Sequence, residues 1–209
     1  TLTLTTPNFS PKPLGLPRIP IAMSAVGPAM LSVAGEVADG LRLHPCSTRR
    51  YLDECSLPRI STGLKKTNRN RSKIEVISGA FMATGKDDEA VSKMREYIRF
   101  RISFYCSTRA YWDVLRLHGL EELGERLRPY PAQNRWNEMA ALISDDVLEL
   151  FAIVGRHDEL ANKVAEKYEG LADSLSLFIP TDTAPGPLGE VMQDIQKIPM
   201  HFNGADLSW

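Results

Sequence analysis

The stretch that decides the fold is Ile19–Pro45, IPIAMSAVGPAMLSVAGEVADGLRLHP. It opens with a short apolar run, Ile19–Val26, and closes with a second one, Leu41–Pro45. Runs of this length are typical of strands that are buried on both faces. Between them, Gly27 and Pro28 suit the start of a helix, because Pro fits the first helical position. The stretch therefore predicts a strand, a helix and a second strand, which is the repeating unit of a parallel sheet.

Apolar residues of the expected helix recur at a spacing that places them on one face. This spacing predicts a stripe that faces the core. The stripe consists of Met30, Val33, Ala34, Val37 and Ala38.

The rest of the chain continues the alternation of strands and helices. Two more strands are predicted at Ile74–Ala83 and Ser174–Pro180. Helices are predicted at Thr48–Lys66 with an interruption at Pro58, Asp87–Cys106, Asp145–Ala152 and Asp158–Glu169. We therefore expect an α/β fold with about four parallel strands and right-handed crossovers. It would be a single domain over 1–209, with a helical insertion at 109–153 and a loose C-terminal tail at 181–209.

Composition and charge restrict the class of protein. The chain has 209 residues, of which 43% are hydrophobic, and a net charge of −1. This mix excludes a wholly disordered chain, and no apolar run approaches the roughly 18 residues that a membrane span needs. The near-zero charge argues against a nucleic-acid partner. Three cysteines without a C-x-x-C spacing suit a reducing compartment, so we expect a cytoplasmic protein without disulfides.

The turn after the first strand is the first candidate binding site. Ligands of parallel β/α folds bind at the carboxyl ends of the strands. Ala25, Val26, Gly27 and Pro28 occupy such an end, and the N–H groups of the following helix can hold a phosphate or another anion. Gly27 would allow a close backbone approach. The alternative is an ordinary tight turn without a ligand.

The end of the second strand carries His44 and Cys46. A histidine there can donate a hydrogen bond to a ligand or titrate near neutrality. The alternative is a partly buried histidine that bonds to a backbone carbonyl. The two residues do not make a metal site, since a third ligand is missing.

An aromatic cluster with hydroxyl groups follows the long helix. It can form the wall of a pocket for a flat heterocycle or an apolar substrate, but core packing of the insertion explains it equally well. Motifs of dinucleotide-binding folds, P-loop NTPases, α/β-hydrolases and zincins do not occur. The cluster consists of Phe104, Tyr105, Ser107, Thr108, Tyr111 and Trp112.

Four segments together resemble a known family. They are Ile19–Pro45, RFRISFYCSTRAYWDVLRLHGLEELGERL from Arg99, RWNEMAALISDDVLELFAIVG from Arg135 and LADSLSLFIP from Leu171. They are similar to luciferase-like monooxygenases, and in particular to the branch of oxidoreductases that depend on the deazaflavin coenzyme F420. The resemblance runs from about Thr1 to Pro180.

The resemblance implies a (β/α)8 barrel of the TIM type and a flavin-type activity. Members transfer a hydride between a reduced deazaflavin or flavin and a small organic substrate, or oxygenate a substrate with FMN. Coenzyme F420 is the expected cofactor, with FMN as the alternative. By this resemblance Ala25–Pro28, His44 and Cys46 would contact the cofactor, whereas Tyr105, Ser107 and Thr108 would line the substrate pocket.

The chain matches only the second half of such proteins. We therefore expect the C-terminal half of a barrel, present as a fragment, as a homodimer or with a separate N-terminal half. The groups closest to hydride transfer would lie in the other half, so no catalytic acid or base is assigned. The alternative function is a non-catalytic β/α binding or interaction module.

Overall fold

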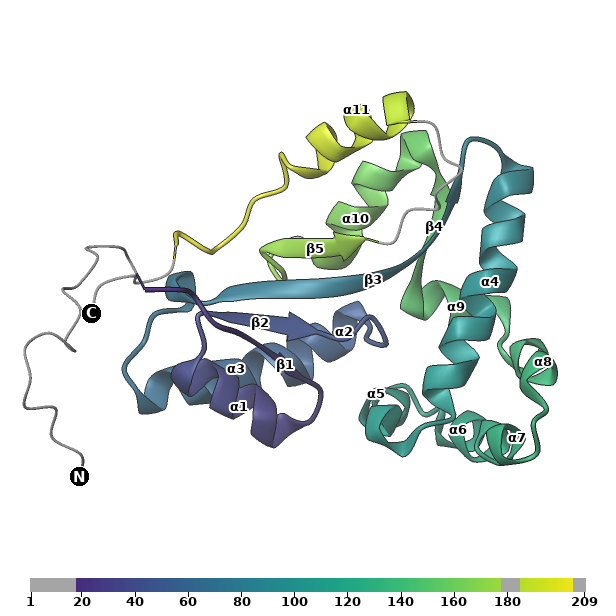
Figure 1. The fold of residues 1–209 in the computed structure, drawn as a ribbon, viewed down its shortest axis with the longest axis horizontal. Helices are drawn as coiled ribbons and strands as arrows, with labels where there is room; N and C mark the ends of the chain where they lie inside the picture. Colours follow the sequence, from purple (N-terminus) through teal and green to yellow (C-terminus); the bar gives the residue numbers. More distant parts are fainter. Residues whose placement is uncertain (1–17, 178–184, 205–209) are drawn as a thin grey trace, which may run out of the picture.

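A single parallel sheet forms the centre of the molecule (Figure 1). The computed structural model describes residues 18–177 and 185–204. Neighbouring strands follow the order β1-β2-β3-β4, and β5 also pairs with β3. Within the described ranges the sheet does not close into a barrel. The strands are β1 (Ala22–Ala25), β2 (Gly40–Leu43), β3 (Glu75–Gly85), β4 (Ala152–Arg156) and β5 (Ser174–Leu177).

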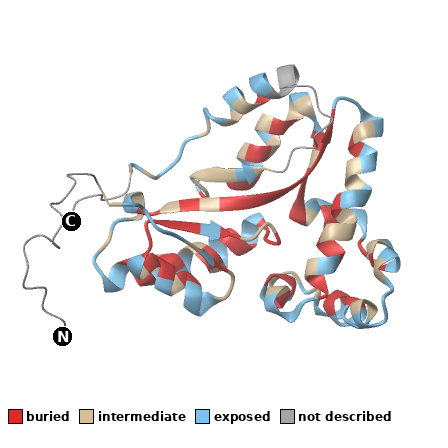
Figure 2. Cartoon of the chain, in the orientation of Figure 1, coloured by how far each residue is buried: buried red, intermediate tan, exposed pale blue. Residues whose placement is uncertain are grey.

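Strand β3 holds the sheet together, because three other strands pair with it. Its first residues, Glu75–Ser78, pair with β2, and Ile77–Ala80 pair with β5. Its last part, Phe81–Gly85, pairs with β4. Nearly the whole strand is buried (Figure 2).

The helices of the first core cover one face of the sheet, whereas the long helix at Asp88–Cys106 packs on the other face of β3, against Phe81 and Ala83. Leu31 and Ala34 of α1 and Ile60 of α3 pack with Leu41 and Val76 of the strands in one apolar core. In Figure 1, α1 and α3 lie along β1 and β2, whereas α10 and α11 lie near β5. The helical elements are α1 (Pro28–Val37), α2 (Arg49–Tyr51), a π-helical turn (Leu52–Ser56), α3 (Leu57–Lys66), α10 (Leu160–Tyr168) and α11 (Pro185–Ile195).

A second group of helices extends away from β1 and β2 and has a core of its own. Asp87 caps the long helix α4 by accepting a hydrogen bond from the Ala90 amide at 2.9 Å. Phe151, Leu127 and Met139 are among the side chains buried in this second core. The helices are α4 (Asp88–Cys106), α5 (Trp112–Leu117), α6 (Glu121–Leu127), α7 (Pro129–Ala132), α8 (Trp136–Met139) and α9 (Asp145–Phe151).

The structure confirms the parallel α/β fold and changes several details. β4 was not predicted, since its residues follow a helix directly and lack a turn signal. Pro58 does not interrupt the second helix, because it lies in the first turn of α3. Within the expected loose tail, α11 forms and Val191 is buried in the first core. The part of the fourth strand after Leu177 falls outside the described residues.

The predicted core stripe of α1 is wrong for three of its residues. Met30, Val33 and Val37 are exposed, whereas Leu31 and Gly35 are buried with the two alanines of the stripe. The core face is rotated because α1 must contact both the sheet and α3. Among the described residues, no helix is long and apolar enough to cross a membrane.

Two glycines set the distance between α1 and α3. A Cβ atom added at Gly35 would lie 2.3 Å from the carbonyl oxygen of Ile60. One added at Gly63 would lie 1.9 Å from the carbonyl oxygen of Ser32. Real Cβ atoms do not approach backbone oxygens so closely, so the two helix backbones touch at a place where only glycine fits.

We predict that Gly35→Ala and Gly63→Ala each destabilise the protein. Alanine normally favours a helix by about 1 kcal/mol over glycine, but the overpacking here costs about 1–3 kcal/mol or more. Gly27→Ala is the control, because nothing lies within 4 Å of its added Cβ and its φ of −80° suits any residue. Urea denaturation measures the free energies of unfolding. Stabilisation by Gly35→Ala would contradict the packing argument.

Candidate functional site

The ends of β1 and β2 lie side by side and form a rim at the carboxyl edge of the sheet. Ala25 is in register with Leu43, so the turn after β1 and His44 begin at the same level. Ala25, Val26, His44 and Cys46 line a common cavity with Tyr111. This cavity measures about 20 Å³, which suffices for one water molecule. A cofactor would therefore have to lie over the rim and not inside this cavity.

Gly27 leaves open space on the rim. Its φ and ψ of −80° and 157° are extended, and its added Cβ would meet nothing within 4 Å. The fold therefore explains neither the glycine's conformation nor its missing side chain. No side chain caps the N-terminus of α1, which has ten residues and begins at Pro28. The first turn of α1, with the N–H groups of Ala29 and Met30 and the positive end of the helix, thus lies next to the space that Gly27 leaves free.

His44 is held in one orientation and one tautomer. Its Nδ1 accepts a hydrogen bond from the Cys46 amide at 3.0 Å, so the proton of the neutral ring is on Nε2. The ring centroid lies 4.4 Å from that of Tyr105 and 4.6 Å from that of Tyr111. Partial burial, and secondarily the charge of Arg101, lower the pKa of His44 to about 4. His44 is therefore a neutral hydrogen-bond donor at physiological pH.

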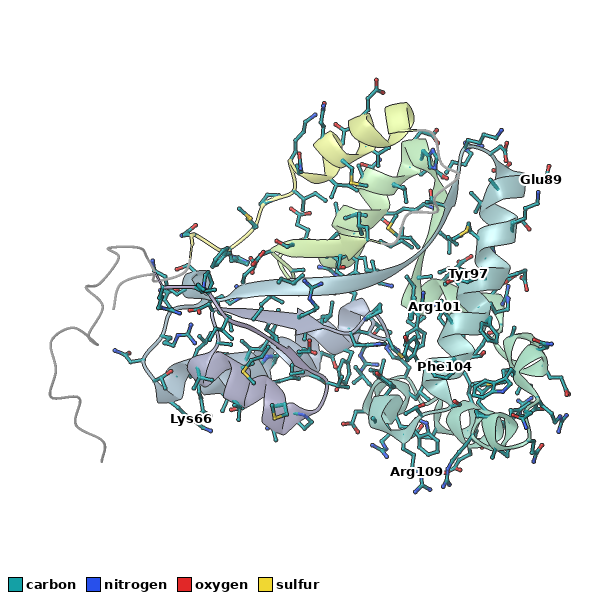
Figure 3. The ribbon with its side chains drawn as sticks, viewed as in Figure 1. Lys66, Glu89, Tyr97, Arg101, Phe104 and Arg109 are labelled. Atoms are coloured by element: carbon teal, nitrogen blue, oxygen red, sulfur yellow. The ribbon has the colours of Figure 1, made fainter. Side chains whose placement is uncertain are left out.

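Tyr105 belongs to a continuous aromatic group around His44. Its ring contacts Phe104 at 5.1 Å, Phe81 at 5.9 Å and Tyr111 at 5.4 Å, measured between centroids. Figure 3 labels Phe104 and Arg101, which lie on the lower half of α4.

The remaining predicted residues have different surroundings. The Ser107 hydroxyl donates to the Phe104 carbonyl oxygen at 2.6 Å, and Thr108 is exposed. Cys46 is buried in the second core, where contact with Cys106 and burial raise the pKa of its thiol. A protonated, buried thiol is a poor nucleophile.

Ser47 is a rim residue that sequence reasoning missed. Its hydroxyl is buried without a hydrogen-bond partner in the described part of the chain, and the residue lines the same small cavity as His44. Buried hydroxyls normally have a partner, so this group has room to bond to water or to a ligand. The sequence did contain a signal for Ser47, because this residue directly follows Cys46 in the segment after the end of β2.

A larger cleft, of about 880 Å³, lies between α2, α9, β4 and α10 and contains none of the predicted site residues. Its basic side chains are engaged with the protein. Arg49 donates to the Glu166 carbonyl oxygen at 2.8 Å, and Lys163 donates to that of Val154 at 2.6 Å. Lys167, whose pKa burial lowers to about 7, donates to the Phe151 carbonyl oxygen at 2.6 Å. These hydrogen bonds hold the cations against helix ends and strand β4, and four carboxylates line the same cleft, which disfavours an anion there: Asp53, Glu54, Glu149 and Glu166.

We predict that NMR titration of His44 gives a midpoint near pH 4. Arg101→Gln should raise this pKa, but the value should stay below the usual 6.5 because burial is the larger cause. Arg95→Gln is the control, since Arg95 lies on the same helix and bonds to Asp145 and Glu149 instead. A wild-type midpoint near 6.5 would show that the ring is not desolvated.

The lowered pKa of His44 also affects the stability of the folded protein at acidic pH. Between about pH 6.5 and 4 the unfolded chain binds a proton at His44 that the folded protein does not. The contribution of His44 to stability is therefore complete above pH 6.5 and is lost as the pH falls toward 4. His44→Asn should therefore reduce the fall in the free energy of unfolding between about pH 6.5 and 4.

Comparison with known proteins identifies the family of the chain and shows how much of its relatives the chain spans. A sequence profile of the family described as "Luciferase-like monooxygenase" matches residues 1–174. An uncharacterized protein of Mycobacterium tuberculosis is 39% identical over 168 residues, which cover 80% of this chain and 49% of that protein. The 5,10-methylenetetrahydromethanopterin reductase of Methanopyrus kandleri is 28% identical over 150 residues, which cover 71% of this chain and 41% of the reductase.

Solved structures show a similar fold. The coenzyme F420-dependent tetrahydromethanopterin reductase of Methanopyrus kandleri matches with a TM-score of 0.64 at 23% identity, over 86% of this chain and 50% of that one. An F420-dependent secondary alcohol dehydrogenase, in complex with an F420–acetone adduct, matches with a TM-score of 0.58 at 16% identity, over 85% and 49%. The chain thus spans about half the length of the relatives that it matches.

Proposed function

Because the chain belongs to the luciferase-like monooxygenase family, we propose that it forms part of an oxidoreductase that binds coenzyme F420. FMN is the alternative cofactor. The reaction would transfer a hydride between the cofactor and a small organic substrate, and the cofactor supplies the hydride chemistry when it is bound. The named relatives, which include F420-dependent enzymes, support this proposal. The observation that carries it is the open rim at Gly27.

The rim suits the phosphate-bearing part of such a cofactor. Gly27 has no side chain to block an approaching group, and the uncapped N-terminus of α1 favours a negative charge. Ala25, Val26 and Pro28 complete the turn. The unpartnered Ser47 hydroxyl, on the neighbouring loop, is a further hydrogen-bonding group at this edge.

His44 and its aromatic neighbours suit a positioning role. The Nε2–H group of the neutral ring would donate a hydrogen bond, and the Cys46 amide holds the ring in that orientation. Cys46 acts through its backbone, since its thiol is buried. We retain Tyr105 as the main candidate for the wall of the substrate pocket. Ser107 and Thr108 would contribute to that wall by shape, because the Ser107 hydroxyl already bonds within α4.

The second candidate function is a β/α binding module without catalysis. The observation in its favour is that the cavity at the rim has a volume of only about 20 Å³. In this case the rim would form a structural edge and coenzyme F420 would not bind. Binding of the cofactor distinguishes the two functions directly.

We predict that the chain changes the fluorescence of coenzyme F420 in a saturable titration. With part of a site present, the expected dissociation constant lies between about 1 μM and 1 mM, or about −8 to −4 kcal/mol. Gly27→Val should weaken binding at least tenfold, because its side chain would fill the space over the rim. Parallel titrations with FMN identify the preferred cofactor.

Asn162→Val is the matched control, since Asn162 is exposed on α10. Circular dichroism verifies that both variants fold. The absence of saturable binding at 1 mM for both cofactors, or equal affinity of wild type and folded Gly27→Val, would overturn the proposal.

A further inference from the structure

Two of the three cysteines lie together where the loop after β2 meets the helices of the second core. Cys46 belongs to this loop, and Cys106 is the last residue of α4. Both side chains are buried in the second core, with exposed fractions of 3% and 0%. They contact each other, because a hydrogen bond with Cys106 is the main cause that raises the pKa of the Cys46 thiol. All three thiols are free, and the third, Cys55, is partly exposed.

Noncovalent contacts join the segment after β2 to the helices of the second core. The Thr48 hydroxyl oxygen lies 2.8 Å from Nε2 of His118, at the end of α5. Arg50 donates a hydrogen bond to the Leu117 carbonyl oxygen at 3.0 Å, and its own side chain is exposed. Contacts of this kind break and reform singly. A covalent bond between Cys46 and α4 would therefore hold the two parts together more firmly than these contacts do.

The small cavity at the rim gives access to one of the two thiols. Cys46 lines this cavity of about 20 Å³, as does Ser47 with its unpartnered hydroxyl, whereas Cys106 does not. Space for one water molecule suits a small polar oxidant of nearly the same size, such as hydrogen peroxide. It excludes a bulky oxidant such as glutathione disulfide. Oxidation would therefore begin at Cys46.

From the contact between the thiols and the access to one of them, we infer that Cys46 and Cys106 form a redox pair. Hydrogen peroxide converts this pair into a disulfide, which fixes the loop after β2 to the end of α4. Two thiols in contact reach the S–S distance of about 2 Å by rotation of their side chains, without a shift of whole helices or strands. The inference does not rest on the proposed cofactor.

The oxidation has two steps, which together consume one molecule of peroxide. In the first step the sulfur of Cys46 attacks the peroxide, the O–O bond breaks, and a sulfenic acid and one water form. In the second step the sulfur of Cys106 attacks the sulfur of Cys46 and the S–O bond breaks. The leaving hydroxide takes the proton of the Cys106 thiol and becomes a second water. Two electrons have then passed from the thiol pair to the peroxide.

The surroundings of Cys46 make the first step slow. The thiolate is the reactive form of a cysteine, and both the contact with Cys106 and burial raise the pKa of the Cys46 thiol. Brief exposure to an oxidant therefore leaves the pair reduced, whereas sustained exposure closes the disulfide. A small external thiol such as dithiothreitol reopens it by thiol–disulfide exchange.

The test is peptide mapping by mass spectrometry after the folded full chain has been incubated for hours with hydrogen peroxide. We expect a pair of peptides joined through Cys46 and Cys106, which dithiothreitol separates. Glutathione disulfide should modify Cys55 at least about tenfold faster than either buried thiol, since only Cys55 is partly exposed. The oxidised protein should also unfold at a higher urea concentration than the reduced protein, because the disulfide constrains the unfolded chain.

Cys55→Ala is the matched control and should retain both the disulfide and the higher urea midpoint, whereas Cys106→Ala should lose both. Circular dichroism verifies that the variants fold, and the mapping of the wild type needs no variant. The inference would be overturned if Cys46 and Cys106 stay reduced, if they are oxidised to sulfinic acids without a disulfide, or if the disulfide forms only in urea. A disulfide that leaves the urea midpoint unchanged or lowers it would overturn the fixing of the loop to α4. Cofactor titration is independent of all these outcomes.

Discussion

The pairing of β3 with three other strands is the constraint on which the structure depends. Its first part fixes β2 on one side, and through β2 the edge strand β1. Its middle part holds β5, and its last part holds β4. Because all these pairs are parallel, the carboxyl ends of β1 and β2 meet at one edge. The rim with Gly27 and His44 is a consequence of this pairing.

The helices then determine which surfaces remain open. α1 approaches α3 through Gly35 and Gly63, and this contact turns the apolar side with Val37 away from the core. The helices of the first core pack on one side of the strands, and α4 packs on the other side of β3 alone, so Ser24 of β1 and Arg42 of β2 remain exposed. The molecule therefore combines a well-packed interior with an edge strand, β1, and exposed apolar side chains on α1 that have no partner among the described residues.

Much of the fold followed from the sequence, because short apolar runs and turn residues are local signals. The first two strands and the helix between them were found in this way, as was α4 with its cap Asp87. The core side of α1 was not found, because periodicity identifies an apolar stripe without showing what covers it. β4 was missed because its residues follow α9 directly, without a turn signal between the helix and the strand.

The candidate site could also be predicted only in part from the sequence. Position after a strand predicted that the turn after β1 and His44 lie together, and in the structure Ala25, Val26 and His44 line one small cavity. Sequence could not show that the Ser107 hydroxyl is engaged within α4 or that the Ser47 hydroxyl is not engaged. Such bonds depend on side-chain geometry and not on residue type. The sequence could therefore predict which residues lie at the strand ends, whereas the side-chain contacts required the structure, and contact with a cofactor or a substrate stays a prediction.

Contact between the rim and the cofactor can be measured directly by an NMR map of the chain with coenzyme F420. We expect the amides of Ala29 and Met30, in the first turn of α1, and the Nε2–H group of His44 to shift together and to saturate at one concentration. Shifts confined to the large cleft around Arg49 and Lys163, with the rim unchanged, would contradict it.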